Sequence, residues 1–286
     1  MLTNTFRHLP GIGAKTERRL WEAGILEWEG LSGKKGLEWS NKRSQALAGH
    51  LQASRAHLES GDPGYFTDRL PPGSHWRIFP EFRSTAVYLD IETDGLDRYA
   101  GSVTTIALYD GRQVSCYVKD RNLEKFETDV KSYDLIISYN GKSFDIPFIE
   151  SSLGVRLSQS HIDLRYVLSS LGLQGGLKRC ESLLGIGRGD LAGLDGYWAV
   201  WLWREYQYAG NPKALDTLLA YNVQDVINLE RLMVTAYNRK ISRTPLGDRR
   251  RLAVPDTPEN PFKPDRETID RIRKRLFFGV GDRRGY

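Results

Sequence analysis

The chain has 286 residues, of which 27% are charged, and its formal net charge is +5. That length can bury a substantial core, whereas two cysteines, Cys116 and Cys180, are too few for a disulfide framework. Because no run of about 18 apolar residues occurs, we expect no membrane span, and we expect a cytoplasmic protein in a reducing compartment.

The first 60 residues have a helical pattern. Lys15–Ala23 carries Leu20 and Trp21 on a charged background, and Asn41–Leu58 places leucines at helical spacing. A Gly-, Pro- and aromatic-rich stretch, 61–83, follows and is typical of a connector that wraps over a neighbouring surface.

The segment HLPGIGAKTERRLWEAGI, which begins at His8, resembles half of a helix-hairpin-helix module. The resemblance implies that the hairpin around Gly11 and Gly13 presents backbone amides to a DNA phosphate, with Lys15 adding a positive charge. Only about eight residues precede the hairpin. A purely structural turn is therefore the alternative.

A run of strands opens the next region. The predicted strands are 86–92, 103–109, 114–118 and 135–138, with a short fifth at 161–164. Helical patterns follow at about 164–171, 177–184, 196–208 and 212–239. This order predicts an α/β protein whose mixed sheet is covered by helices. In the aromatic stripe of 196–208 we expect Trp198 and Trp201 in the core, with Trp203 or Tyr206 as candidates for base stacking.

The last segment, 241–286, is basic and Pro-rich, with one predicted helix at 266–276. Residues 239–286 contain 14 Lys or Arg against 7 Asp or Glu, so the rest of the chain, 27 against 29, is slightly acidic. Such a tail favours nucleic-acid binding through phosphate contacts, with a solvated charged tail as the alternative.

Five acidic or phenolic side chains lie within these predicted elements or just after them. Asp90 and Glu92 lie two apart on an apolar strand, so both carboxylates point to one face, an arrangement that favours a hard divalent cation such as Mg²⁺ or Mn²⁺. Asp145 follows the fourth strand, and Tyr221 and Asp225 are four apart on one helix face. Four acids can thus converge on one pocket.

The segment around Gly141-Lys142-Ser143 looks at first like the end of a phosphate-binding P-loop. That motif requires a glycine five positions before Gly141, where this chain has Ile136. We therefore interpret the segment as a strand that delivers Asp145.

Taken in order, Asp90-x-Glu92, Asn140-x3-Phe144-Asp145 and Tyr221-x3-Asp225 resemble the three motifs of the DEDD exonuclease superfamily. The branch is the tyrosine-bearing one, because the position five before Asp225 is Ala220 and not histidine. His161-Ile162-Asp163 resembles a stretch of family B DNA polymerase proofreading domains, and the whole chain resembles the YprB-type ribonuclease H-like proteins.

This resemblance implies a ribonuclease H-like domain at 84–240, between the helical region 1–60 with its connector 61–83 and the tail 241–286. It implies that Asp90, Glu92, Asp145 and Asp225 hold two Mg²⁺ or Mn²⁺ ions that activate water and stabilise the leaving oxygen, while Tyr221 orients the attacking water. Asn140, Lys142 and Phe144 are the candidate nucleic-acid contacts. The roles of His161 and Asp163 stay open.

The implied function is a 3′–5′ exonuclease that releases nucleoside 5′-monophosphates from single-stranded DNA or RNA, with contacts to adjacent duplex as a further option. Two alternatives are a structure-specific endonuclease, which the hairpin and tail could support, and a nucleic-acid-binding adaptor without catalysis. The sequence does not distinguish DNA from RNA, and it identifies no protein partner.

Overall fold

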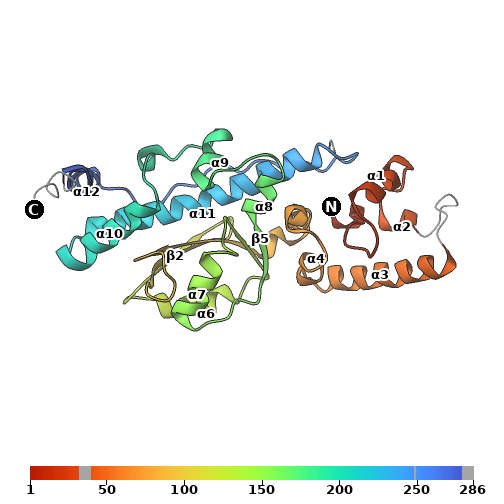
Figure 1. The fold of residues 1–286 in the computed structure, drawn as a ribbon, viewed down its shortest axis with the longest axis horizontal. Helices are drawn as coiled ribbons and strands as arrows, with labels where there is room; N and C mark the ends of the chain where they lie inside the picture. Colours follow the sequence, from red (N-terminus) through yellow and green to blue (C-terminus); the bar gives the residue numbers. More distant parts are fainter. Residues whose placement is uncertain (32–39, 248, 279–286) are drawn as a thin grey trace, which may run out of the picture.

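One five-stranded mixed sheet forms the centre of the computed structural model, which describes residues 1–31, 40–247 and 249–278 (Figure 1). The strand order is β3-β2-β1-β4-β5, with β1 antiparallel to β2, β2 antiparallel to β3, and β1, β4 and β5 parallel. The strands are β1 (Ala86–Thr93), β2 (Val103–Tyr109), β3 (Val114–Val118), β4 (Leu135–Ser138) and β5 (Ser160–Asp163). The predicted α/β class and mixed sheet are confirmed.

Helices cover both faces of this sheet. Side chains of β1 alternate, so Val87, Leu89 and Ile91 pack against α6 (Phe126–Val130) and α7 (Asp145–Leu153). On the other face Tyr88 lies in the core that includes the long helix α11 (Pro212–Ile241). Figure 1 shows α6 and α7 below the sheet and α11 above it. The even-numbered side chains of β1 therefore point toward α11.

The helix α11 begins with clear local signals. The Asn211 side chain accepts a hydrogen bond from the backbone amide of Lys213, and Pro212 occupies the first helical position. The remaining helices on this side are α8 (Leu164–Ser169), α9 (Leu177–Leu183) and α10 (Gly196–Ala209). Each lies within one or two residues of its predicted bounds.

The turn between β4 and α7 depends on a glycine. A Cβ on Gly141 would lie 2.1 Å from the Ser138 hydroxyl oxygen, and Asn140 adopts a φ of +66°. The sequence analysis missed α6 and α7. Both are short, and Pro147 in the first turn of α7 hides its helical pattern, although proline is tolerated there.

The N-terminal region contains α1 (Ala14–Glu22), α2 (Trp28–Leu31) and α3 (Asn41–Glu59), preceded by a 3₁₀ helix, η1 (Leu2–Asn4). The segment before the hairpin is thus a 3₁₀ turn rather than an α-helix. Part of the loop between α2 and α3, residues 32–39, lies outside the described residues.

The predicted connector consists mostly of short helices. They are α4 (Gly64–Thr67), η2 (Pro72–Arg77), α5 (Phe79–Phe82) and η3 (Arg83–Thr85), and two further 3₁₀ helices, η4 (Leu123–Lys125) and η5 (Gly189–Leu191), occur later. Here η2 packs against α8, β5 and α11. A buried ion pair joins it to α1, because Arg77 donates to both carboxylate oxygens of Glu17 at 2.8 and 2.7 Å.

The C-terminal tail folds back along α11 (Figure 1). The Asn238 side chain exchanges two hydrogen bonds with the backbone of Leu252, at 2.8 and 2.9 Å, and Asn260 donates to the backbone oxygen of Ala220 at 2.7 Å. The tail ends in α12 (Arg266–Phe278), whose Ile272 is buried in a cluster with α10. The last residues of the predicted tail, 279–286, lie outside the described residues.

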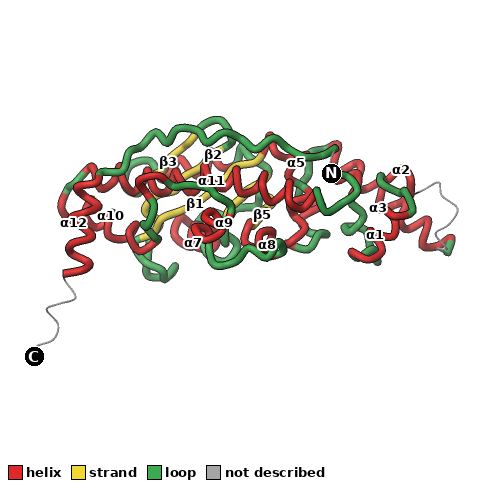
Figure 2. The backbone as a smooth tube through the Cα atoms, turned by 90° about the horizontal axis from the view of Figure 1, so that it is seen from above, coloured by secondary structure: helices red, strands yellow, loops and turns green. Residues whose placement is uncertain are grey.

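The whole molecule is elongated, with α1 to α3 at one end, α10 and α12 at the other and the sheet between them (Figure 2). None of the helices in the described ranges combines the length and the apolar composition of a membrane span.

Candidate active site

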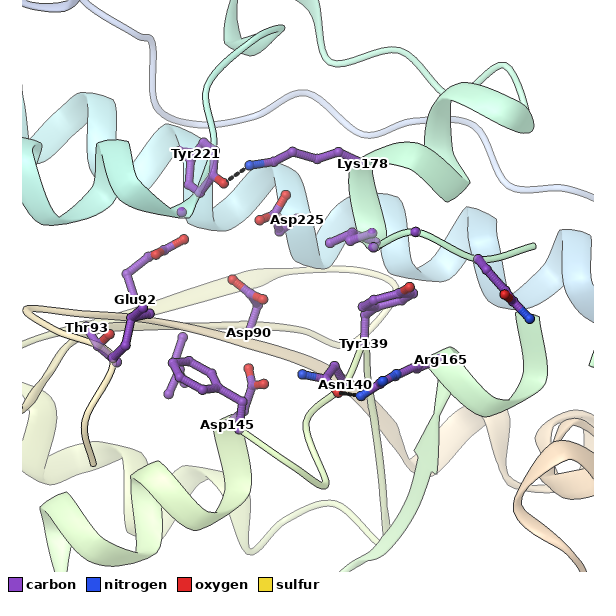
Figure 3. Close-up of a pocket in the computed structure, with 18 of the residues that line it drawn as sticks. Asp90, Glu92, Thr93, Tyr139, Asn140, Asp145, Arg165, Lys178, Tyr221 and Asp225 are labelled. Atoms are coloured by element: carbon purple, nitrogen blue, oxygen red, sulfur yellow. Dashed lines mark hydrogen bonds between the residues drawn. The ribbon is translucent and has the colours of Figure 1, made fainter. Parts of the chain in front are cut away.

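Three carboxylates meet between the sheet and α11. Asp90 and Glu92 project from one face of β1 and Asp225 projects from α11, so that one oxygen from each lies within 4.8 Å of the others. Figure 3 shows the three groups facing a common space. Strand alternation places the first two together, and the packing of α11 across that face brings the third.

Burial makes this cluster electrostatically costly. Glu92 and Asp225 are only 8% and 5% exposed. Removal from water, followed by the charge of Asp225, raises the pKa values of both Asp90 and Glu92 well above their usual range. A hard divalent cation with oxygen ligands would relieve this repulsion, so the donor set fits Mg²⁺ or Mn²⁺.

Asp145 lies in the same cleft but outside the group of three. It occupies the first position of α7 and is 4% exposed, and burial raises the pKa of its carboxyl to about 7. The charges of Asp163 and Asp225 add to this increase. The Asp145 carboxylate therefore faces the group of three from the opposite side of the cleft (Figure 3).

Tyr221 lies one helical turn before Asp225 and is buried. Its hydroxyl accepts a hydrogen bond from the ammonium of Lys178 on α9, whose nitrogen is 4.4 Å from the ring centroid. Burial raises the pKa of the Tyr221 phenol and lowers the pKa of Lys178. The phenol therefore stays protonated at neutral pH and can donate a hydrogen bond.

Two polar residues that the sequence analysis did not identify hold the carboxylates in place. Asn222 donates to Asp90 at 2.7 Å and accepts from Thr105 at 3.1 Å. Arg188 forms an ion pair with Asp225 and a second one with Glu181 at 2.9 Å. Asn222 could have been found, because it is three residues before Asp225 on the same helix; Arg188 lies in a Gly-rich loop that carries no such signal.

The second motif forms the far wall of the cleft. The carboxylate of Asp163 accepts from the backbone amides of Asn140, Lys142 and Arg165 at 2.8, 3.2 and 3.0 Å. Arg165 in turn donates to the Asn140 side-chain oxygen at 2.5 Å. His161 hydrogen bonds the Ser138 hydroxyl at 2.8 Å, and burial lowers its pKa to about 3. Asp163 and His161 thus maintain the loop that presents Asn140.

Together these residues enclose a cleft of about 930 Å³. Among the lining residues are Asp90, Glu92, Tyr139, Asn140, Phe144, Asp145, Arg165, Lys178, Tyr221 and Asp225 (Figure 3).

Other sequence candidates lie elsewhere. Lys142 is exposed and does not line the cleft, and Gly11, Gly13 and Lys15 lie at the start of α1, at the N-terminal end of the molecule. The expectation that Trp203 stacks on a base is wrong, since this side chain is 4% exposed and packs in the core between α10 and α11.

The mixed sheet and its carboxylate cluster define a ribonuclease H-like nuclease fold. A family model described as RNase H superfamily matches residues 87–237. This match covers more than half of the chain, and the chain therefore belongs to the RNase H superfamily.

Solved structures give weaker similarities. The family B DNA polymerase from the hyperthermophilic archaeon Pyrobaculum calidifontis is 17% identical with a TM-score of 0.41, over 55% of this chain and 24% of the polymerase chain. NrnC from Brucella melitensis bound to pGG is 19% identical with a TM-score of 0.38, over 58% of this chain and 77% of that one. The same protein with bound Mg²⁺ is 18% identical, with the same TM-score and coverage. A comparison with curated proteins found no match. The assignment to the superfamily rests on the family model alone.

Proposed function

We propose that this protein is a metal-dependent nuclease that hydrolyses phosphodiester bonds at the 3′ ends of single-stranded nucleic acid and releases nucleoside 5′-monophosphates. The observation that supports it is the convergence of Asp90, Glu92 and Asp225 within 4.8 Å in a cleft of this fold. Buried carboxylates at this spacing are costly in a protein without a cation to hold, and they suit one that binds divalent ions.

The charged side chains of the cleft and Tyr221 have separate roles in this proposal. Asp90, Glu92 and Asp225, with Asp145 beside them, would hold two Mg²⁺ or Mn²⁺ ions, which supply activation of water and stabilisation of negative charge when bound. The protonated hydroxyl of Tyr221 orients the attacking water, and the Lys178 ammonium fixes that hydroxyl. Asp225 is also paired with Arg188, so holding a metal ion would compete with this ion pair.

The terminal nucleotide would lie against the far wall of the cleft. Asn140 and Arg165 offer polar groups there, and the half-buried ring of Phe144 offers an apolar face for a base. The backbone amides of Asn140 and Arg165 are already bound to the Asp163 carboxylate, so hydrogen bonds within the protein hold this wall in place.

The decisive experiment follows the length of 5′-labelled single-stranded DNA and RNA incubated with the protein and Mn²⁺ or Mg²⁺, with a chelator control. We expect a ladder that shortens from the 3′ end and disappears with chelator. Cleavage at internal sites near a duplex junction would instead indicate an endonuclease, and binding without cleavage would indicate an adaptor.

The Asp225→Asn variant tests the site itself. Loss of one ligand charge should lower the cleavage rate by about 10³-fold or more, since metal-ion catalysis contributes several kcal/mol, while strand binding is retained. Asp216→Asn is the matched control, because Asp216 is exposed on the same helix. Near-normal turnover by Asp225→Asn would overturn the proposed site.

A further inference from the structure

A second cleft, of about 750 Å³, lies at the junction of the N-terminal helices, η2 and the end of α11. Five cations line it against two carboxylates: Arg7, Arg18, Arg77, Lys240 and Arg243 against Glu17 and Glu22. Arg18 belongs to the segment that resembles half of a helix-hairpin-helix module, and Lys240 and Arg243 belong to the basic C-terminal stretch, but the sequence did not predict that they line one cleft.

The positive charge in this cleft is largely unpaired. Glu17 pairs with Arg77, but in the described ranges Arg7, Arg18, Lys240 and Arg243 form no ion pair. Arg7 instead donates to the Ser74 hydroxyl at 2.7 Å. Four cations gathered in one hollow repel one another, and an anion would relieve that repulsion.

The pKa of Lys240 reflects the positive charge around it. Burial lowers its pKa to about 8, and the neighbours that lower it further are Arg243, Arg77 and Arg7, all of them cations. Within residues 1–31, 40–247 and 249–278, its ammonium donates a single hydrogen bond, a long one of 3.4 Å to the backbone oxygen of Ser170. An anion such as a phosphate would be a better partner for this group than the backbone oxygen it contacts.

Consecutive residues at the end of α8 line the two clefts. Ser169, at the end of this helix, lines the acidic cleft, and the next residue, Ser170, lines the basic one. Figure 2 shows α8 between the sheet and the N-terminal helices. A strand that leaves the acidic cleft past Arg165 and the end of α8 would run toward the basic cleft.

We propose that the basic cleft binds backbone phosphates of the same nucleic-acid strand, on the 5′ side of the nucleotides held in the acidic cleft. This inference rests on the proposed function for the position of the 3′ end, and on the geometry of the two clefts for the rest. Phosphates are shared by DNA and RNA, so the cleft would bind both and would contribute affinity without sequence preference.

The test is binding of a labelled single strand in chelator, where no cleavage can occur, by fluorescence anisotropy over a range of salt concentrations. The variant R18A/R243A removes two exposed, unpaired cations from the cleft and leaves the buried pair intact. The matched control R112A/K125A removes two exposed cations that line neither cleft.

We expect R18A/R243A to bind a long strand about tenfold more weakly at low salt. Its slope of log K against log salt should be shallower by about 0.7 for each phosphate that the variant no longer neutralises. A dinucleotide, too short to leave the acidic cleft, should compete equally well for wild type and variant. The control should behave as wild type, and melting temperatures should agree.

Three results would overturn the inference: R18A/R243A binding long strands like the control, equal losses for long strand and dinucleotide, or no binding of strands by the wild type. The proposed function fails separately, if wild-type protein with Mn²⁺ or Mg²⁺ leaves every strand uncut while the variant still weakens binding.

Discussion

At the scale of single residues, the buried carboxylates determine how the protein responds to pH. Burial holds the pKa of Asp145 near 7, against an ordinary value of 3.8. The folded state therefore keeps a proton that the unfolded state loses as pH rises from about 4 to 7, so folding becomes less favourable across this window.

Asp145→Asn should remove this effect. Without metal, we expect the variant to melt about 3–8 °C higher than wild type at pH 7 and to show no difference below pH 4. Thermal melts in chelator at several pH values measure it. Glu150→Gln, a half-exposed acid on the same helix, serves as the control. A variant less stable than wild type at pH 7 would contradict the prediction.

Tyr221→Phe separates orientation of water from metal binding. The change removes one hydroxyl and leaves the ring packed, so we expect the cleavage rate to fall by about 10²-fold with metal affinity unchanged. Rates over a Mn²⁺ titration measure both quantities. Tyr197→Phe alters an exposed tyrosine and should have no effect. A shifted Mn²⁺ midpoint would instead assign Tyr221 to the metal site.

Sequence patterns place the candidate acids well, because each belongs to a short local motif. Asp90 and Glu92 follow from strand alternation, and Tyr221 and Asp225 from helix spacing. The ion pair of Arg188 with Asp225 could not be predicted, since it joins a glycine-rich loop to α11 through tertiary packing alone. The position of Asp145 outside the group of three carboxylates could not be predicted either, because it depends on how α7 packs against the sheet.

At the scale of elements, the strands were predicted within about a residue and helices α8 to α11 within about two, whereas α6 and α7 were missed. The strands are short apolar runs, with β2 and β4 buried along their whole length, and α10 and α11 are long enough for a helical pattern to stand out. The exceptions were short. α6 has five residues and η2 is a 3₁₀ helix, and both are stabilised by contacts with the sheet or with α8 rather than by a pattern of their own.

Ile272→Ala tests whether α12 is an integral element. Ile272 is 1% exposed, and both Arg271 and Arg275 of the same helix pair with Glu205 of α10 at 2.9 and 2.7 Å. We expect the free energy of unfolding to fall by about 2–5 kcal/mol in urea denaturation.

The control for this prediction is Val254→Ala, because Val254 lies in the same tail and is 49% exposed. Equally small effects of both changes would instead support the alternative that the tail is a solvated charged segment. The packing also means that deleting the tail would expose α10 and α11. Charge substitutions are therefore the better way to measure its contribution to binding.

At the scale of the whole molecule, a buried ion pair joins α1 to η2, the short helix that packs against α8, β5 and α11. Glu17 and Arg77 are 2% and 5% exposed, and Glu17 also accepts from the backbone amide of Phe6 at 2.8 Å. No sequence pattern links positions 60 residues apart. The docking of α1 on η2 was accordingly beyond sequence analysis.

Glu17→Gln should loosen this junction. The change leaves the Arg77 charge buried and unpaired, and we expect a loss of about 3–5 kcal/mol. Hydrogen exchange should quicken in residues 1–31 more than in α11. The control, Glu29→Gln, breaks an exposed pair with Arg55 and should cost about 1 kcal/mol or less. Uniform loss of protection along the chain would show that the two parts unfold as one.

The return of the tail along α11 also sets an order of events during synthesis. The ribosome makes α10 and α11 before residues 249–278, so the apolar surface that Ile269 and Ile272 cover emerges without its partner. A released chain that ends at Ile241 would leave this apolar surface of α10 and α11 uncovered. The back of the helix that carries Tyr221 and Asp225 is covered only when the later segment has been translated and has folded onto it.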